Sequence, residues 1–220
     1  RIRLIDRNDT LLKQSPPFNR EAAQSALDQR GVWVDLDTTL LQVNANDIVV
    51  EYKGQTDTLP ADLVLWTVGN AIAAPIRALP VSHAEDGRLQ VDTTLNLTQQ
   101  PHLFALGDVA ESRDANGLAV PTTAQAAIQQ ADCVAWNVWA SLSGRPLLPF
   151  RYAHLGEMLT LGTDTAALAG LGVTLEGPFA YLARRFIYLY RMPTLEHQLK
   201  VGLNWVVKPI LTALQSQPSV

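Results

Sequence analysis

The chain has 220 residues, of which 47% are hydrophobic, and a formal net charge of −4. This is enough for one large or two small domains with a sizeable core. The acidic balance gives no support for a nucleic-acid partner, the single cysteine, Cys133, excludes a disulfide framework, and no uncharged apolar run reaches the roughly 18 residues of a membrane span.

The first sixty residues predict strands and one early helix. Ile2–Ile5 is expected to form a strand that ends at Asp6, and Asn19 and Gly31 are expected to cap the helix that follows. Further strands are expected at Val32–Val34, Leu40–Val43, Ile48–Tyr52 and Thr56–Leu59. Because RIRLID begins at once as a strand, with no initiator Met and no signal-peptide pattern, we expect the chain to start inside a longer protein.

Two apolar runs each predict a strand that ends at a glycine. Leu63–Val68 is continuous, which is typical of a strand buried on both faces, and Gly69 follows it. Leu103–Leu106 leads in the same way into Gly107. Small β segments are expected between them, at Arg88–Val91 and Leu95–Leu97.

From residue 121 onward the apolar residues recur mainly at helical spacing. A helix is expected over 121–141, with a break at 144–146 and a β-hairpin over 160–171. Two amphipathic helices are expected over 178–215, interrupted at 192–193.

Asp6 and Gly69 are weak candidates for a ligand site. An acid at the carboxyl end of a Rossmann strand binds adenosine ribose hydroxyls, but the Gly-rich loop that completes this fingerprint is expected roughly 20 residues earlier. From this feature alone, a solvated acid is the better interpretation. Gly69 would let the backbone approach a flat ring closely, and a plain turn glycine is an equally good reading.

Asp108 has a stronger context. A strand, the pair Gly107-Asp108, a loop and a helix that begins Pro-Thr-Thr-Ala124-Gln125 form one connected unit. The helix start presents N–H groups and a partial positive charge, and a carboxylate accepts hydrogen bonds from a polyol. The unit therefore predicts a flavin site, with the ribitol at Asp108 and the electron-rich N1–O2 ring edge at Ala124 and Gln125.

The motif LFALGDVA resembles the second FAD-binding motif of the two-dinucleotide-binding-domain flavoproteins, and DLVLWTVGN resembles the strand that precedes it there. AQAAIQQA resembles the quinone-site motif A-Q-x-x-x-Q of the type II NAD(P)H:quinone oxidoreductases, supplied here by Gln125 and Gln129. The stretches WNVWASLSGRPLLPFRYAHLGEMLTLGTDTAAL and PTLEHQLKVGLNW resemble the cyanobacterial and plastid C1-type branch, which is linked to demethylphylloquinone and plastoquinone reduction. The resemblance covers nearly the whole chain, but both Gly-rich loops of the family are absent.

The resemblance implies an α/β fold, the carboxyl-terminal part of a two-Rossmann flavoprotein with an amphipathic helical tail. Residues 1–97 would belong to the NAD(P)H-binding domain, residues 98–150 to the return segment of the FAD-binding domain, and residues 151–220 to a quinone-site and membrane-associating region. It implies FAD as cofactor, NADH or NADPH as co-substrate, and electron transfer to a plastoquinone or demethylphylloquinone without proton pumping. It places the protein peripherally on the cytoplasmic or stromal face of a thylakoid or plasma membrane, and it allows a homodimer.

Gln125 and Gln129, at i and i+4, share one helix face and suit a quinone carbonyl, although glutamines on an Ala-rich helix are usually only solvated. The four histidines lack metal-ligand spacing, so no metal site is predicted. No acid–base catalytic residue is assigned. Two other functions stay open: a soluble ferredoxin-reductase-like flavin reductase, and a fragment that is inactive by itself.

The two tail helices are expected to lie on a membrane without crossing it. Their apolar stripes comprise Phe179, Leu182, Ala183, Phe186, Ile187 and Tyr190, then Leu195, Leu199, Leu203, Val206, Val207, Ile210 and Leu214. Arg184, Arg185, Arg191, Lys200 and Lys208 lie off the stripes. Basic amphipathic helices suit the membrane interface, and the alternative is packing on the protein's own core or on a dimer partner.

Overall fold

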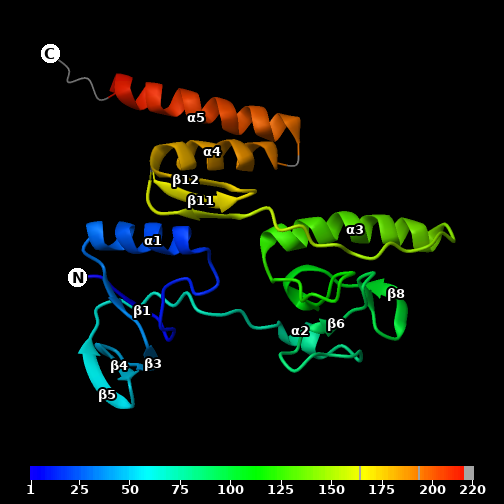
Figure 1. Ribbon diagram of the computed structural model, residues 1–220, viewed down its shortest axis with the longest axis horizontal. Coiled ribbons are helices and arrows are strands. Elements are labelled where there is room, and N and C mark those ends of the chain that lie inside the picture. Colours follow the sequence, from blue (N-terminus) through cyan, green and yellow to red (C-terminus); the bar gives the residue numbers. More distant parts are fainter. Residues whose placement is uncertain (164, 193, 216–220) are drawn as a thin grey trace. The chain divides into compact units, whose positions relative to one another are not determined.

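The computed structural model describes residues 1–163, 165–192 and 194–215, with side chains given through 205 and at 207 (Figure 1). It is a mixed α/β structure, as expected, and it divides into two compact units. One unit joins Arg1–Leu65 to Leu155–Val220, and the other is Trp66–His154.

The first unit opens with a β-α-β element. Strands β1 (Arg3–Ile5) and β2 (Trp33–Asp35) pair in parallel and are connected through helix α1 (Pro17–Gln29). Gly31 follows the end of α1 with φ +66°, as its predicted C-terminal role requires.

Asn19 does not cap α1, so that prediction is wrong. The helix already begins at Pro17, because the fixed φ of proline suits a first helical position. Asn19 lies two residues inside the helix, is completely buried, and donates from Nδ2 to the main-chain oxygen of Glu157 at 3.4 Å.

The predicted strands that follow are confirmed. Strands β3 (Thr38–Val43), β4 (Asp47–Tyr52) and β5 (Gln55–Pro60) form one antiparallel sheet. Lys53 and Gly54, between β4 and β5, both have positive φ, at 48° and 79°. Two such residues make the tight turn that matches the twist of a hairpin.

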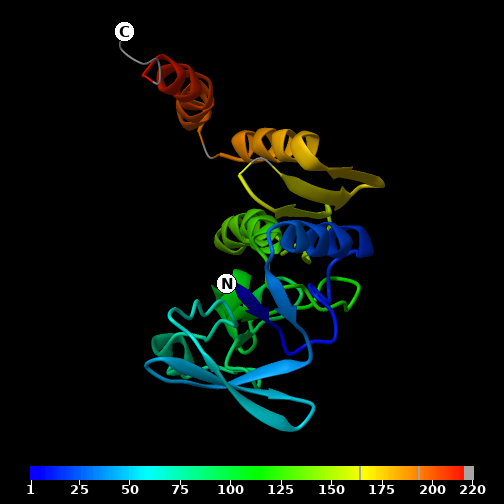
Figure 2. The ribbon, with the colours of Figure 1, turned by 90° about the vertical axis from the view of Figure 1, so that its left-hand side faces the viewer.

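A second antiparallel sheet of this unit has helices on both of its faces (Figures 1 and 2). Its strands are β10 (Glu157–Thr160), β11 (Ala166–Gly170) and β12 (Val173–Glu176). The hairpin predicted over 160–171 corresponds to the β10–β11 pair, whose first strand lies earlier than expected, before residue 161. Helix α1 packs on it from one side and α4 (Gly177–Tyr190) from the other. The buried contact residues are small, namely Ala22, Ala23, Ala26, Ala166, Ala167, Ala169 and Ala180.

Two glycines let the main chains of neighbouring segments approach closely at the end of the β10–β11 pair. A Cβ added at Gly156 would lie 2.4 Å from the Cα of Gly170 and 2.6 Å from the main-chain oxygen of Ala169. A Cβ added at Gly170 would in turn lie 2.6 Å from the Cα of Gly156. Since real Cβ atoms do not approach backbone this closely, only glycine fits at either position.

Helix α5 (Leu195–Gln215) follows α4 after a short break, and Pro193 in that break lies outside the described residues. Gln198 Nε2 donates to the main-chain oxygens of Tyr190 and Met192, at 3.2 and 3.1 Å. The Arg185 guanidinium lies 4.3 Å from the ring centre of Trp205, which links the two helices. Among the described residues, no helix is long and apolar enough to cross a membrane.

The second unit has short strands beneath one long helix. Strand β6 (Leu89–Gln90) runs parallel to β9 (Ala110–Glu111), and β7 (Asn96–Leu97) pairs antiparallel with β8 (Gln100–Phe104). Helix α2 (Ala74–Arg77) is a single turn, and α3 (Ala124–Leu142) is the long helix. The core of this unit forms two clusters: Leu89, Leu97, Ala105 and Ala110, and Leu95, Val120, Ala126 and Phe150.

The predicted buried strand at Leu63–Val68 is wrong for this structure. The run has no regular secondary structure, and the side chains of Leu63 and Leu65 are 87% and 83% exposed. An apolar run becomes a central strand only when strands pair with it on both sides, and nothing in the described parts of the chain pairs with this one. Gly69, at its end, has φ +73° and turns the chain.

Candidate functional site

The pair Gly107-Asp108 lies in a tight turn just after β8. The chain continues extended through Leu106, and Gly107, with φ +69°, begins a single 3₁₀ turn, Gly107–Val109. The predicted strand Leu103–Leu106 is therefore found slightly earlier than expected. Asp108 is exposed, and within the described ranges no hydrogen bond or ion pair involves its carboxylate.

The N-terminus of α3 lies beside this turn. Thr123 is its N-cap, and the Thr123 Oγ1 accepts a hydrogen bond from the Ala126 amide at 3.2 Å. As the first residue of the helix, Ala124 has no helical acceptor for its N–H. Ala127, in the first turn, has its Cβ 3.4 Å from where a Gly107 Cβ would stand, so the positive end of the helix adjoins the Asp108 turn.

Gln130 links the Asp108 turn to α3, and no role for it was predicted from the sequence. Its side chain is only 2% exposed. Its Oε1 accepts a hydrogen bond from the Gly107 amide at 2.7 Å, and its Nε2 donates to Ser112 Oγ at 2.8 Å. The sequence feature that could have identified Gln130 is a glutamine among alanines on the buried side of a helix, because a buried amide needs hydrogen-bond partners.

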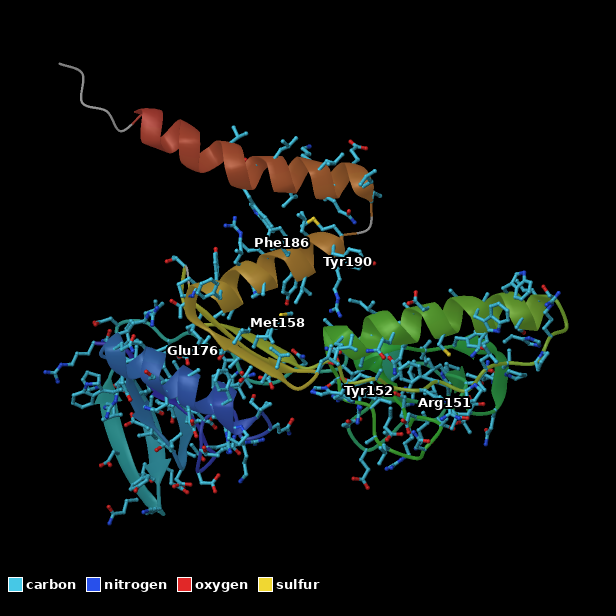
Figure 3. The ribbon with its side chains drawn as sticks, turned by 45° about the horizontal axis from the view of Figure 1, so that its top comes forward. Arg151, Tyr152, Met158, Glu176, Phe186 and Tyr190 are labelled. Atoms are coloured by element: carbon cyan, nitrogen blue, oxygen red, sulfur yellow. The ribbon has the colours of Figure 1, made fainter. Side chains whose placement is uncertain are left out.

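Gln125 and Gln129 point to the same neighbouring segment, as their spacing requires. The Tyr152 hydroxyl donates to Gln125 Oε1 at 3.1 Å. Gln129 is bonded twice to Ala153, because its Nε2 donates to the Ala153 carbonyl and its Oε1 accepts from the Ala153 amide, both at 2.9 Å. Figure 3 shows Tyr152 beside the first half of α3.

Residues 145–154, here called the strap, run extended along α3 and are fixed at several points. Buried Asn137 donates from Nδ2 to the Leu148 carbonyl at 2.9 Å and accepts from the Leu148 amide at 2.8 Å. Near the other end, the Phe150 amide donates to the Thr93 carbonyl at 2.7 Å, and the Phe150 carbonyl accepts from the Ala115 amide at 2.8 Å. The position of the Tyr152 side chain is therefore set by main-chain contacts.

Asp114 is itself held by several donors. Burial acts to raise the pKa of its carboxyl, but the amides of Asn116 and Leu118 donate to the carboxylate at 2.8 and 3.1 Å and outweigh it, so the pKa lies below its usual value. An ionised Asp114 stabilises the loop that supports the strap.

Asp6 lies in the other compact unit, at the end of β1. Its Oδ1 accepts hydrogen bonds from the Asn8 amide at 2.9 Å and from Asn8 Nδ2 at 2.8 Å. Its own amide donates to the Asp35 carbonyl at 2.9 Å, which extends the β1–β2 pairing to the strand end. Among the described residues, no group of three or more His, Cys, Asp or Glu side chains is arranged to hold a metal ion.

The sequence model of the pyridine nucleotide-disulphide oxidoreductases matches residues 1–131, which is more than half of the chain. The chain belongs to the pyridine nucleotide-disulphide oxidoreductase family. The match contains the turn at Asp108 and the start of α3 with Gln125 and Gln129. The Asp108 turn and the two glutamines thus lie in the part of the chain that the family model matches, whereas the strap lies outside it.

Curated relatives narrow the position of this oxidoreductase chain within the family. It is 52% identical to the demethylphylloquinone reductase of a Synechocystis strain, over 100% of this chain and 54% of the relative. It is 38% identical to the Arabidopsis thaliana alternative NAD(P)H-ubiquinone oxidoreductase C1, chloroplastic/mitochondrial, over 97% of this chain and 45% of that one. The chain thus spans about half the length of the curated relatives it matches.

Solved structures agree with the family assignment at the level of fold. The Plasmodium falciparum NDH2 structure in complex with NADH superposes with a TM-score of 0.78, covering 93% of this chain and 57% of that chain at 13% identity. The Aquifex aeolicus sulfide:quinone oxidoreductase superposes with a TM-score of 0.69, covering 86% and 48% at 15% identity.

Proposed function

We propose that the protein is a type II NAD(P)H:quinone oxidoreductase, which passes electrons from NADH or NADPH through FAD to a membrane quinone. The observation that carries this proposal is the exposed carboxylate of Asp108, which lies beside the N-terminus of α3. Its turn is joined to that helix by the hydrogen bond from the Gly107 amide to Gln130. The names of the relatives support it, since one is a demethylphylloquinone reductase and another an NAD(P)H-ubiquinone oxidoreductase.

The residues of the Asp108 turn fit a flavin nucleotide. The Asp108 carboxylate accepts hydrogen bonds from ribitol hydroxyls, and the left-handed conformation of Gly107 brings main chain close to the cofactor. Ala124 and Gln125, at the positive end of α3, face the electron-rich edge of the ring. Bound FAD would supply the two-electron redox chemistry, and the protein orients it.

The rest of the chain is assigned around this centre. Residues 1–97 belong to an NAD(P)H-binding Rossmann domain, with Asp6 at the adenosine ribose and Gly69 against a flat ring. Residues 98–150 return to an FAD-binding domain, which makes the protein a two-Rossmann flavoprotein. Residues 151–220 complete the quinone site and the membrane-associating region.

Gln125 and Gln129 have different roles at the proposed quinone site. The Gln125 amide contacts a quinone carbonyl. Gln129 has an amide oxygen and an amide N–H engaged by Ala153, so its contribution is mainly to hold the strap against α3.

Replacing Asp108 by alanine in the full native-length protein is expected to weaken FAD binding roughly 10- to 100-fold, because a hydrogen bond to a charged group contributes about 1.5–3 kcal/mol. NAD(P)H-dependent quinone reduction should fall in parallel and return when excess FAD is added. FAD titration and steady-state quinone reduction measure the two effects.

Asp132→Ala is the matched control, because Asp132 is an exposed acid on α3. It should leave both FAD affinity and turnover unchanged. Unchanged FAD affinity in the Asp108 variant would contradict the flavin assignment. A protein that binds FAD and oxidises NAD(P)H, but reduces ferredoxin rather than quinones, would support the alternative of a soluble flavin reductase.

The tail helices support a peripheral membrane position, on the cytoplasmic or stromal face. Most residues of the predicted stripes are exposed, namely Phe179, Leu182, Phe186 and Tyr190 on α4, and Leu195, Leu199, Leu203 and Val207 on α5. Their spacing places them in two rows along the helices. Ala183 and Ile187 of the α4 stripe are half-buried. The stripe residues Val206, Ile210 and Leu214, and Lys208, lie outside the side chains that the structure describes.

A row of exposed large apolar side chains along a helix is typical of a protein or membrane interface rather than of a solvated face. Arg184 lies 4.7 Å from the ring centre of Tyr188, and basic and aromatic side chains together suit the headgroup region. Figure 3 labels Phe186 and Tyr190 on α4. A quinone dissolved in lipid requires an enzyme at that surface.

The native-length protein is therefore expected to float with vesicles that contain anionic lipid. The double variant Phe186→Asp, Leu199→Asp should stay at the bottom of the gradient, since it places a charge in each stripe. Leu171→Asp is the matched control, because Leu171 is an exposed leucine in the β11–β12 turn, outside both stripes. If the unmodified protein stays down at low salt and the double variant changes from dimer to monomer, the stripes form a homodimer interface instead.

A further inference from the structure

Reduction of a quinone by NAD(P)H requires one proton beyond the hydride. The hydride supplies two electrons and one proton equivalent, and the quinol carries two protons, so the second must come from solvent. The sequence pattern points to no residue for this task. The structure places two ionisable side chains of the strap, those of Tyr152 and His154, next to Gln125.

The two side chains form a short hydrogen-bonded chain that ends at Gln125. The Tyr152 hydroxyl donates to Gln125 Oε1 at 3.1 Å, and its oxygen lies 3.3 Å from His154 Nδ1. With the tyrosine proton directed to Gln125, the His154 Nδ1–H is the donor to the tyrosine oxygen. His154 is exposed and Tyr152 is half-buried, so the chain runs from solvent inward.

The strap is held in place by main-chain contacts that involve neither the Tyr152 hydroxyl nor the His154 ring. The Ala153 amide and carbonyl, between the two residues, are both bonded to Gln129. The Phe150 amide and carbonyl, two residues before Tyr152, are bonded to Thr93 and Ala115. Structural attachment of the strap therefore does not need the Tyr152 hydroxyl or the His154 ring.

We propose that Tyr152 is the proton donor to the quinone oxygen bound at Gln125, and that His154 returns a proton to Tyr152 from solvent. The proposal rests on the quinone site proposed above, with NAD(P)H as the reductant. The Tyr152 O–H bond breaks as the quinol O–H bond forms. The proton on His154 Nδ1 passes to the tyrosine oxygen while His154 Nε2 takes up a proton from solvent, so the imidazole stays neutral, and exchange with solvent then returns the proton to Nδ1. A positioned donor of this kind typically contributes about 10²–10⁴-fold to a rate.

The charges around the chain suit this direction of transfer. From α3 the facing groups are the neutral amides of Gln125 and Gln129. On the strap, Arg151 is exposed beside Tyr152, and the hydrogen-bond partners of the Tyr152 hydroxyl are Gln125 and His154, neither of which is a carboxylate. No carboxylate among these contacts competes with the quinone for the tyrosine proton.

The test is single-turnover oxidation of the NAD(P)H-reduced, native-length holoenzyme by a short-chain ubiquinone analogue. Tyr152→Phe should slow this step about 10²–10⁴-fold, with FAD content and the rate of flavin reduction by NAD(P)H unchanged. His154→Ala should slow it less, and added imidazole should restore the rate. The unmodified enzyme should show a solvent deuterium isotope effect that the Tyr152 variant lacks.

Two further variants make the outcomes distinguishable. His102→Ala removes another exposed histidine of the same unit and should neither slow the step nor respond to imidazole. Gln125→Ala should raise the quinone KM. If Gln125→Ala raises the KM while Tyr152→Phe leaves the step and its isotope effect unchanged, the proton path is wrong and the quinone site stands. If Gln125→Ala changes nothing, the quinone site itself is wrong.

Discussion

Alanine at Gly156 or Gly170 is expected to produce the largest loss of stability of any single methyl addition in the β10–β12 sheet. The added Cβ would stand 2.4 Å from the Gly170 Cα in the first case and 2.6 Å from the Gly156 Cα in the second. Neither contact is with a flexible side-chain end, so the main chain itself must move. Overpacking of this kind costs about 1–3 kcal/mol.

Gly156 carries an additional cost because its φ is +106°, a conformation that costs an L-residue roughly 1–2 kcal/mol more. We therefore expect the free energy of unfolding to fall by about 2–5 kcal/mol in Gly156→Ala and by about 1–3 kcal/mol in Gly170→Ala. Denaturant unfolding of the native-length protein, followed by circular dichroism, measures both.

Gly172→Ala separates the two causes. Gly172 also has positive φ, at 79°, but a Cβ there meets nothing within 4 Å. This variant should lose only the backbone contribution, roughly 1–2 kcal/mol. A Gly170→Ala protein as stable as the unmodified protein would show that the main chains at Gly156 and Gly170 do not approach each other as closely as in the structure.

Replacing Gln130 by leucine is expected to destabilise the Asp108 turn and, as a consequence, to lower the affinity for FAD. Leucine fills a similar volume but leaves the Gly107 amide and the Ser112 hydroxyl without their partner. A buried polar group that loses its partner costs about 1–3 kcal/mol. We expect a loss of stability in this range, and a loss of FAD affinity of roughly tenfold or more, because Asp108 follows Gly107 directly.

Ser112→Ala is the control for this variant, because it removes only the contact on the far side of Gln130. It should leave the Gly107 hydrogen bond, and therefore FAD affinity, in place. FAD titration of both variants, with unfolding curves measured in parallel, decides the matter. If Gln130→Leu binds FAD as tightly as the unmodified protein, Gln130 is a core residue with no influence on the flavin site.

Features that depend on near neighbours along the chain were predictable from the sequence. The β4–β5 turn follows from Lys53-Gly54, since two consecutive residues with positive φ favour a tight hairpin. The common direction of Gln125 and Gln129 follows from the helical period. Asp108 could be singled out because the strand, the turn and the helix start lie within about twenty residues.

Features that depend on distant partners were decided only by the tertiary structure. The apolar run Leu63–Val68 looks like a buried strand, yet burial requires neighbouring strands, and the described residues provide none. Asn19 looks like a helix cap, but the helix starts earlier, with Pro16 as its N-cap and Pro17 as its first residue. Asn19 therefore lies inside the helix and is buried. Local pattern predicts which conformations are favourable, and packing selects among them.

The contacts that define the candidate site are of this second kind. Gln130 reaches Gly107 across 23 residues, Gln129 reaches Ala153 across 24, and Tyr152 reaches Gln125 across 27. No spacing rule links such positions, because the loops between them set no fixed geometry. The sequence by itself thus identified the family and singled out the Asp108 turn and the amide pair as candidates. Folding of the strap onto α3 decided which amide faces the tyrosine, because only a packed structure fixes where a side chain finds its hydrogen-bond partner.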